Sequence, residues 1–172
     1  MLRLVARHLK KFRRDQRGAV MVEMTLVAPL MLTLSAGVFE FGNLIHDKLL
    51  MEAGLTDGAR FAARCNSQIY TDAGLAIDCA SVATNIAVYG NVAGTGSPRV
   101  PNWQTANVTV TIGTGCHDAV VGGVTQYRST TPQVCIVEAD GTYPYSGVGL
   151  LSVIGIGTIN LTGLHQERLM RF

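Results

Sequence analysis

The feature that most constrains this chain is a run of 27 residues, from Ala19 to Ile45, in which Glu23 and Glu40 are the only charged side chains. As an α-helix the run is about 40 Å long at 1.5 Å per residue, which is enough to cross a bilayer. Pro29 is predicted to kink this helix because proline has no backbone N–H to donate. The run therefore predicts one membrane-spanning helix, with the rest of the chain folding outside the membrane.

The basic charge of the chain lies in front of this run. Residues 1–17 hold seven Lys and Arg against one Asp, a formal charge of +6, whereas the chain from Ala19 onward holds seven basic and eleven acidic residues, a charge of −4. A basic flank before an apolar run predicts a cytoplasmic N-terminus. Nucleic-acid binding is not predicted, because it would need a basic face on the folded part.

Glu23 is a carboxylate near the start of the apolar run, where insertion costs roughly 2.5–3.5 kcal/mol unless the charge is neutralised. Cleavage between Gly18 and Ala19 would create an α-amino group four residues before Glu23, and the pair would attract strongly in a low dielectric. Glycine suits the cut because its backbone enters a protease without a side-chain clash. In an assembling bundle, a subunit out of register would leave the charge unpaired, so Glu23 is predicted to select the register.

Two other interpretations of the N-terminal segment stay open. It is an ordinary single-pass anchor if Glu23 merely lies near the lipid headgroups. It is a secretory signal peptide if it is removed after the apolar region, although the A-x-A pattern of such a site is missing.

The helix is predicted to continue to Arg64, because residues 43–64 place apolar side chains at helical spacing. Gly54 and Gly58 are expected to weaken this stretch by up to about 1 kcal/mol each. The apolar stripe consists of Leu44, Ile45, Leu49, Met51, Leu55, Ala59, Ala62 and Ala63.

A second helix is predicted from an Asp72 N-cap to about Tyr89, with Gly90 ending it. Residues 91–102 are rich in Gly and Pro and indicate a loop. The apolar residues expected to face the core from the second helix are Leu75, Ile77, Val82, Ile86 and Val88.

Three later segments alternate apolar and polar residues, which is typical of strands, and they predict a small antiparallel sheet. The strands are Asn107–Ile112, Gln133–Ala139 and Thr158–Leu164. The fold class is therefore α+β, with a long N-terminal helix, a second helix and a small antiparallel sheet. The glycine-rich segment Gly147–Gly157 stays open between a short helix, a buried turn and a subunit contact.

Four cysteines follow the apolar run, namely Cys65, Cys79, Cys116 and Cys135, and no CxxC motif occurs among them. An even count outside the cytoplasm indicates two disulfides, and three pairings are possible. The pairs Cys65–Cys79 and Cys116–Cys135 are favoured because both close local loops, each stabilising by about 3 kcal/mol. The alternative is four unpaired thiols, some of them buried as small apolar groups.

Signs of an enzyme are few. No two of His8, His46, His117 and His165 have the spacing of metal ligands, so neither a metal site nor a cofactor is predicted. The Cys116-His117-Asp118 sequence is interpreted as a solvated loop beside a disulfide rather than a nucleophilic site. Trp103 is expected to be a core or surface anchor.

The segment from Arg17 to Leu30, with Gly18, Ala19, Glu23 and Pro29, and the later Phe39-Glu40-Phe41-Gly42 resemble the TadE-like pseudopilins of the tight-adherence (Tad/Flp, type IVc) pilus system. This resemblance covers about residues 17–60. It implies cleavage after Gly18 by a prepilin peptidase, and a role for Glu23 as the fifth-position glutamate. It also implies packing into, or priming of, a pilus together with other pilin subunits and the inner-membrane assembly platform.

The resemblance and the residues together predict a three-part chain: a cytoplasmic leader over 1–18 that is removed, a transmembrane and assembly helix over 19–64, and an extracytoplasmic α+β domain over 65–172. Its length favours a minor pseudopilin that catalyses nothing and stays in the bacterial inner membrane or enters the pilus, with the C-terminal domain in the periplasm. Two alternatives are a membrane-anchored adhesin or binding module, and a secreted enzyme behind an uncleaved anchor.

Overall fold

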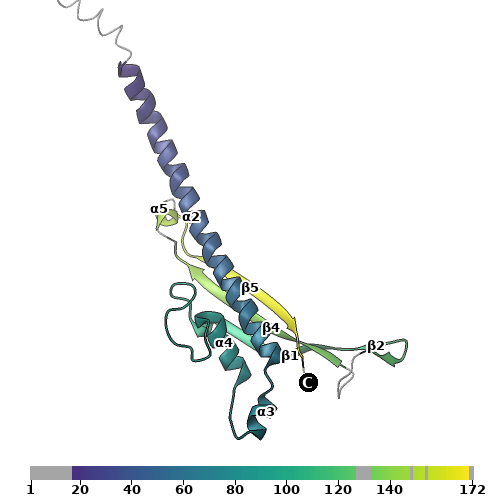
Figure 1. Ribbon diagram of the computed structural model, residues 1–172. Helices are drawn as coiled ribbons and strands as arrows, with labels where there is room; N and C mark the ends of the chain where they lie inside the picture. The colour runs from purple at the N-terminus through teal and green to yellow at the C-terminus, as the bar shows by residue number, and fades with distance from the viewer. Residues whose placement is uncertain (1–16, 127–132, 148, 154, 171–172) are drawn as a thin grey trace, which may run out of the picture. The chain divides into compact units, whose positions relative to one another are not determined.

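The computed structural model describes residues 17–126, 133–147, 149–153 and 155–170 (Figure 1), and it confirms the predicted α+β fold. The chain divides into two compact units, residues 1–42 and residues 43–172. The helices are α2 (Arg17–Arg64), α3 (Ser67–Asp72), α4 (Cys79–Tyr89), the 3₁₀ turn η1 (Thr105–Asn107) and α5 (Leu150–Val153). The strands are β1 (Val108–Asp118), β2 (Val120–Val121), β3 (Val124–Thr125), β4 (Gln133–Tyr145) and β5 (Ile159–Arg168).

Helix α2 is 48 residues long, as the continuous apolar and amphipathic pattern predicts. From residue 43 onward one face of it is buried in the core of the second unit, including Met51, Leu55 and Ala59. Ile45 and Leu49 were expected on this face, but they are 55% and 59% exposed. The expectation is wrong because each lies two residues, or about 200° around the helix, from a buried position.

Helix α4 packs closely against α2 through small residues. A Cβ atom placed on Gly54 would lie 2.3 Å from the carbonyl oxygen of Ala87, and one on Gly58 would lie 2.8 Å from that of Ala83. Only glycine allows this approach. Gly54 and Gly58 were expected to weaken the helix, but they form its contact with α4.

The predicted start of the second helix is wrong. Asp72 ends α3, and the N-cap of α4 is Asp78, whose carboxylate accepts hydrogen bonds from the N–H groups of Ala80 and Ser81 at 3.0 and 3.3 Å. Gly74 interrupts the helix between them in the left-handed region, with φ of 75°. Gly90 ends α4 as predicted, with φ of 72°.

The core face of α4 also differs from the prediction. Its buried residues are Cys79, Ala83, Ala87 and Val88, so Val88 is the only fully buried member of the predicted set. Leu75 precedes the helix and is 60% exposed. Small residues form the buried face because the backbones of α2 and α4 are too close for larger side chains.

The three long strands form an antiparallel sheet in the order β1-β4-β5, and each strand extends beyond its predicted end. One face of this sheet packs under α2, because Gly141 and Gly163, which are cross-strand partners, both lie against Leu55. An added Cβ would lie 3.0 Å and 2.8 Å, respectively, from a Leu55 methyl carbon. Side chains alternate along each strand, so the neighbours of these glycines face away from α2.

Trp103 lies in the core at 1% exposure, where its indole Nε1–H donates to the Thr142 carbonyl at 3.0 Å. Strands β2 and β3 form a separate hairpin whose turn is Gly122-Gly123, both with positive φ. In the segment 147–157 the described residues include the short helix α5, which is one of the three forms expected there.

Candidate assembly site

The N-terminal part of α2 presents apolar side chains around its whole circumference. All described side chains from Gly18 to Leu34 are exposed, and large ones such as Met21, Leu26 and Leu32 are more than 70% exposed. An exposed apolar surface of this extent indicates contact with lipid or with other apolar helices. Among the described residues this is the one helix that is long and apolar enough to cross a membrane.

Glu23 lies on this exposed surface, one helical turn after Ala19. None of the ion pairs between described residues involves Glu23. No atom lies within 4 Å of a Cβ placed on Gly18, so the peptide bond after it is not covered by another part of the described chain. Glu23 is therefore an exposed carboxylate on the apolar part of α2.

Two hydroxyl groups inside the apolar part are bonded to the backbone of the helix itself. The hydroxyl of Thr25 donates to the Met21 carbonyl at 2.7 Å, and that of Thr33 donates to the Leu30 carbonyl at 2.9 Å. Such bonds remove the cost of placing a hydroxyl in lipid. Helix α2 continues through Pro29 without interruption, and the kink expected there stays a prediction.

In the second unit, ionic contacts fasten α2 to its surroundings. The Lys48 ammonium donates to the Thr162 carbonyl of β5 and pairs with Glu52 at 2.9 Å. Asp57 pairs with Arg99 at 2.7 Å, which ties α2 to the loop after α4. These contacts are partly exposed, so they orient the helix more than they stabilise it.

A second cluster joins α2 to β5 near the end of the helix. The carboxylate of Glu167 lies 3.3 Å from Arg60 Nε and 3.2 Å from His165 Nε2, and His165 Nδ1 lies 3.4 Å from the Thr56 hydroxyl. The hydrogen bond with His165, together with Arg60, holds the pKa of Glu167 below its ordinary value. The carboxylate is therefore charged in the folded protein at neutral pH.

Tyr143 of β4 is also buried, and its hydroxyl donates to the Pro101 carbonyl at 3.0 Å. Burial raises the pKa of Tyr143, and the negative charge of Asp47 adds to the effect. The phenol is therefore neutral and acts as a structural donor.

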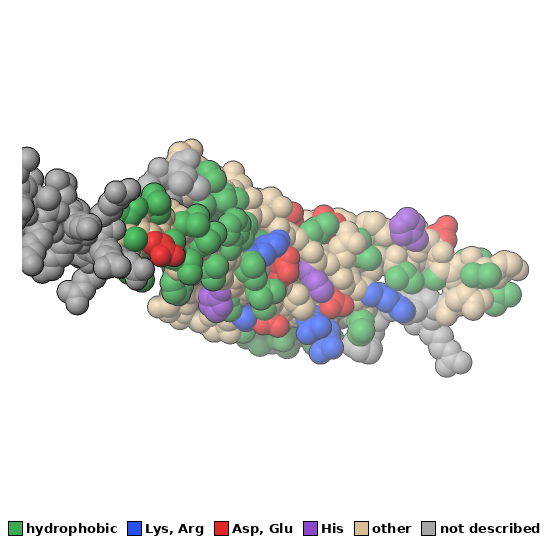
Figure 2. All heavy atoms as spheres, turned by 90° about the horizontal axis from the view of Figure 1, so that it is seen from above, with side chains coloured by type: hydrophobic (Ala, Val, Ile, Leu, Met, Phe, Trp, Pro, Cys, Tyr) green, Lys and Arg blue, Asp and Glu red, His purple; other side chains and the backbone are tan. Residues whose placement is uncertain are grey.

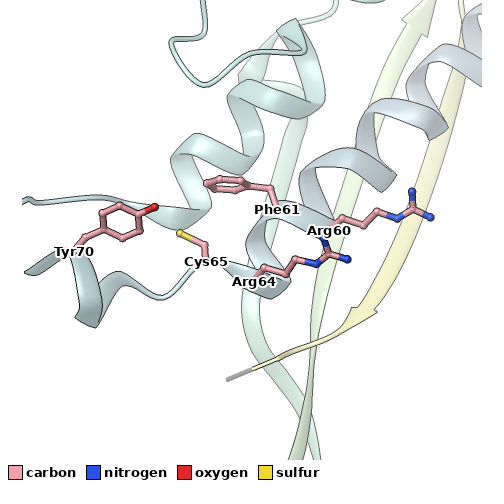
Figure 3. Close-up of a pocket in the computed structure, with 5 residues that line it drawn as sticks. All are labelled: Arg60, Phe61, Arg64, Cys65 and Tyr70. Atoms are coloured by element: carbon pink, nitrogen blue, oxygen red, sulfur yellow. The ribbon is translucent and has the colours of Figure 1, made fainter. Parts of the chain in front are cut away.

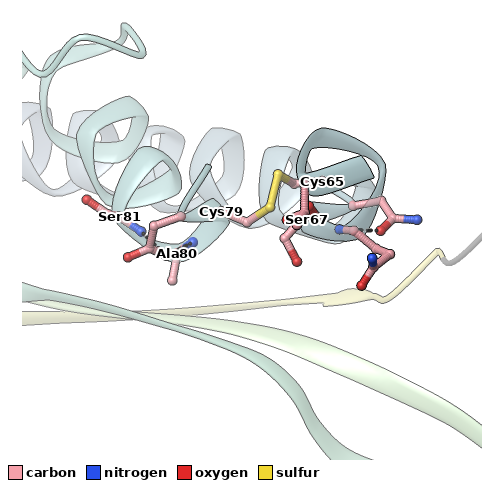
Figure 4. Close-up of a disulfide and its surroundings, with 9 residues drawn as sticks. Cys65, Ser67, Cys79, Ala80 and Ser81 are labelled. Atoms are coloured by element: carbon pink, nitrogen blue, oxygen red, sulfur yellow. Dashed lines mark hydrogen bonds between the residues drawn. A yellow bond between two sulfur atoms is a disulfide. The ribbon is translucent and has the colours of Figure 1, made fainter. Parts of the chain in front are cut away.

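Cys65 and Cys79 form a disulfide, which is one of the two pairs favoured from the sequence. Figure 4 shows the sulfur bridge joining the turn after α2 to the first residue of α4. It closes around α3, which begins with Asn66 as its N-cap. The bridge thus fixes α4 beside the end of α2, where Gly58 and Ala83 meet.

Cys116 and Cys135 form the other disulfide, between β1 and β4. It lies where the register of these strands shifts, next to Gly115 with φ of 54°. The bridge excludes Cys116 as a free nucleophile beside His117.

A cavity of about 270 Å³ lies at the end of α2, lined by Arg60, Phe61, Arg64, Cys65 and Tyr70. Figure 3 shows Phe61, Cys65 and Tyr70 on one side, with the Arg60 and Arg64 side chains extending together on the other. The cavity therefore combines an apolar wall with two guanidinium groups, a combination that suits an apolar side chain next to a carboxylate.

No cluster of His, Cys, Asp and Glu that could hold a metal ion occurs in the part of the chain that the structure describes. His8 lies outside the described residues.

Four glycines bring α2 close to its neighbours, and none of them was predicted to do so: Gly54, Gly58, Gly141 and Gly163. The spacing of Gly54 and Gly58, four residues apart on one helix face, is a detectable signal for close packing. The partners of Gly141 and Gly163 follow only from the strand register, which the sequence does not reveal.

Comparison with protein families identifies the N-terminal helix. A family model described as TadE-like protein matches residues 18–60, which confirms the resemblance inferred from the residues. The match includes Gly18, Ala19 and Glu23, and it ends within the part of α2 that packs in the second unit. No curated protein and no solved structure matches the chain.

Proposed function

We propose that this chain, TadE-like over residues 18–60, is a minor pseudopilin of a Tad (type IVc) pilus. The match indicates a pilus-associated protein, and the exposed apolar half of α2 supports a role in which helices pack together. In this proposal a prepilin peptidase removes residues 1–18, leaving Ala19 as the N-terminus. The protein then either primes the filament or is incorporated into it.

The observation that carries the proposal is the position of Glu23. It is an exposed carboxylate on an otherwise apolar helix surface, one turn after the proposed cut, and no described residue forms an ion pair with it. A new amino group at Ala19 of the same or a neighbouring chain would neutralise it in a medium where an isolated charge is costly. Only a subunit in the correct register would form the pair.

The same proposal gives each of the other parts of the chain a location. The leader stays in the cytoplasm, α2 crosses the inner membrane, and the domain beyond residue 64 lies in the periplasm or on the pilus. Two disulfides support an oxidising location for that domain. The partners are other pilin subunits, the prepilin peptidase and the assembly platform in the inner membrane.

The test is a Glu23→Gln substitution in cells that make pili. Glutamine keeps the size of the side chain and removes the charge, so insertion and cleavage are expected to continue while incorporation into sheared pili falls. Glu52→Gln is a matched control on the same helix. Pili that incorporate the Glu23→Gln protein at the normal level would overturn the proposed register role.

A second candidate is an anchored adhesin, favoured by the exposed valines of the β2–β3 hairpin, of which Val121 is 70% exposed. Removing residues 66–172 separates the two functions. An adhesin that is only tethered by α2 predicts normal piliation with lost adhesion, whereas the pseudopilin proposal predicts loss of pili.

A further inference from the structure

On the uncovered face of the sheet, the exposed apolar side chain of Leu164 lies beside two acidic residues of β4, with Gln166 and Arg168 further along β5. Leu164 of β5 is 59% exposed, and Asp140 of β4 is its direct cross-strand partner. Glu138 lies two residues from Asp140 on the same face and accepts a hydrogen bond from Gln166 at 2.6 Å. We call Leu164, Asp140 and Glu138 the acidic knob.

The cavity at the end of α2 has the complementary character. Its wall of Phe61 and Tyr70 is apolar, and Tyr70 is 40% exposed. Arg60 pairs with Glu167, whereas Arg64 has no ion pair with any residue that the structure describes. The guanidinium groups of Arg60 and Arg64 outnumber the single carboxylate of Glu167, so this end of α2 carries a net positive charge.

Knob and cavity cannot meet within one chain. Leu55 packs against Gly163, so α2 and the cavity at its end are on one side of the sheet, while the neighbouring Leu164 points to the other side. They can meet only between molecules. Charges of both signs are spread over the face of the molecule that Figure 2 shows. A specific contact between two copies therefore needs a place where an apolar side chain and a charge occur together.

We propose that the acidic knob of one copy docks into the cavity of a second copy of this chain. Leu164 enters between Phe61 and Tyr70, and Asp140 meets Arg64. The contact uses two different surfaces, so it is heterologous and leaves each copy with one further knob or cavity to offer to the next copy. It deepens the proposed assembly function by adding a contact between domains to the packing of the helices.

The apolar and the ionic parts are both needed, because an exposed ion pair alone contributes little. The charges select the orientation, since like charges placed face to face strongly disfavour association. A second copy is the occupant because it carries the opposite charge and the apolar side chain in the required neighbouring positions.

The contact is tested in the full chain, in membranes of cells that make pili. A photo-activated benzophenone amino acid at position 164 is expected to crosslink to peptides containing residues 60–70 of another copy, producing a ladder of dimers, trimers and larger species. The same probe at position 121, a valine of the hairpin that is more exposed than Leu164, is the control and is expected to give none of this adduct. A crosslink only to a different protein, or no adduct with residues 60–70, overturns the proposal.

Charge exchange provides the second test. Arg64→Glu and Asp140→Arg are each expected to lower the adduct about tenfold, since each places like charges together. The two substitutions combined in one chain are expected to restore it, whereas Asp118→Arg, on an exposed acid of β1, leaves it unchanged. Failure of the combined variant to restore the adduct overturns the pairing. Cleavage at Ala19 and the Glu23→Gln phenotype are scored in the same cells, so a failure here is distinguished from failure of the proposed function.

Discussion

Gly54 of α2 and Ala87 of α4 meet through their backbones, because a Cβ on Gly54 would lie 2.3 Å from the Ala87 carbonyl oxygen. The disulfide between Cys65 and Cys79 holds the same two helices together at the end of α2. Residues 51–63 of α2 are therefore part of the core of the second unit.

The first prediction concerns this contact. Gly54→Ala is expected to destabilise the second unit by about 1–3 kcal/mol, because the added methyl group meets a backbone atom that cannot rotate away. Thermal unfolding followed by circular dichroism of the detergent-solubilised chain measures the effect. Gly42→Ala is the control on the same helix, with no atom within 4 Å, and is expected to be neutral or slightly stabilising. Equal stability of the two variants would contradict the close contact.

Gly163→Ala is expected to cost less than Gly54→Ala. The added Cβ would lie 2.8 Å from Leu55 Cδ1 and 3.0 Å from Met51 Cε, which are ends of flexible side chains. These ends can move by a few tenths of an ångström, whereas a carbonyl oxygen held in a helix cannot. The ranking of the two unfolding temperatures checks this difference.

The second prediction concerns the disulfides. Replacing Cys65 and Cys79 by Ser together is expected to lower the stability of the second unit by about 3 kcal/mol, because the unfolded chain gains the freedom of the opened loop. The loss is measured as a lower unfolding temperature. The Cys116/Cys135 double replacement gives a matched comparison and is expected to have a similar effect. An unchanged unfolding temperature in both double variants would show that neither bridge constrains the unfolded chain.

The third prediction is a pH dependence. The pKa of Glu167 is lower in the folded protein than in the unfolded chain, so the unfolded chain binds its proton first as the pH falls. Its contribution to stability is therefore fully present above the unfolded pKa and is lost as the pH falls through the folded pKa. Glu167→Gln is expected to flatten the loss of stability between neutral and acidic pH. A variant as acid-sensitive as the parent protein would contradict this role.

The fourth prediction concerns processing. Gly18→Leu is expected to block the proposed cut, because a branched side chain would clash in a peptidase that accepts glycine. No described atom lies near this position, so the substitution leaves the fold intact. Mass spectrometry of the membrane-extracted protein should find Ala19 at the N-terminus of the parent and the uncut leader in the variant. An uncut parent protein in piliated cells would refute the cleavage.

Much of the fold follows from local pattern. The long helix, the end of α4 at Gly90, the three strands and the two local disulfides are all predicted correctly because they depend on hydrophobic period, glycine conformation and short loop closure. The start of α4 is wrong because both Asp72 and Asp78 can cap a helix, and the left-handed Gly74 decides between them.

The features of the candidate site also fall into those that local sequence predicts and those that depend on the tertiary fold. By itself the sequence determined the apolar helix, the position of Glu23 after Gly18 and the TadE-like identity of residues 18–60, because these are properties of neighbouring residues along one helix. The tertiary fold alone reveals that Gly54 meets Ala87, that Gly141 and Gly163 lie together against Leu55, and that Leu164 faces away from α2. Those relationships depend on strand register and helix packing, which bring together residues that are far apart in the chain.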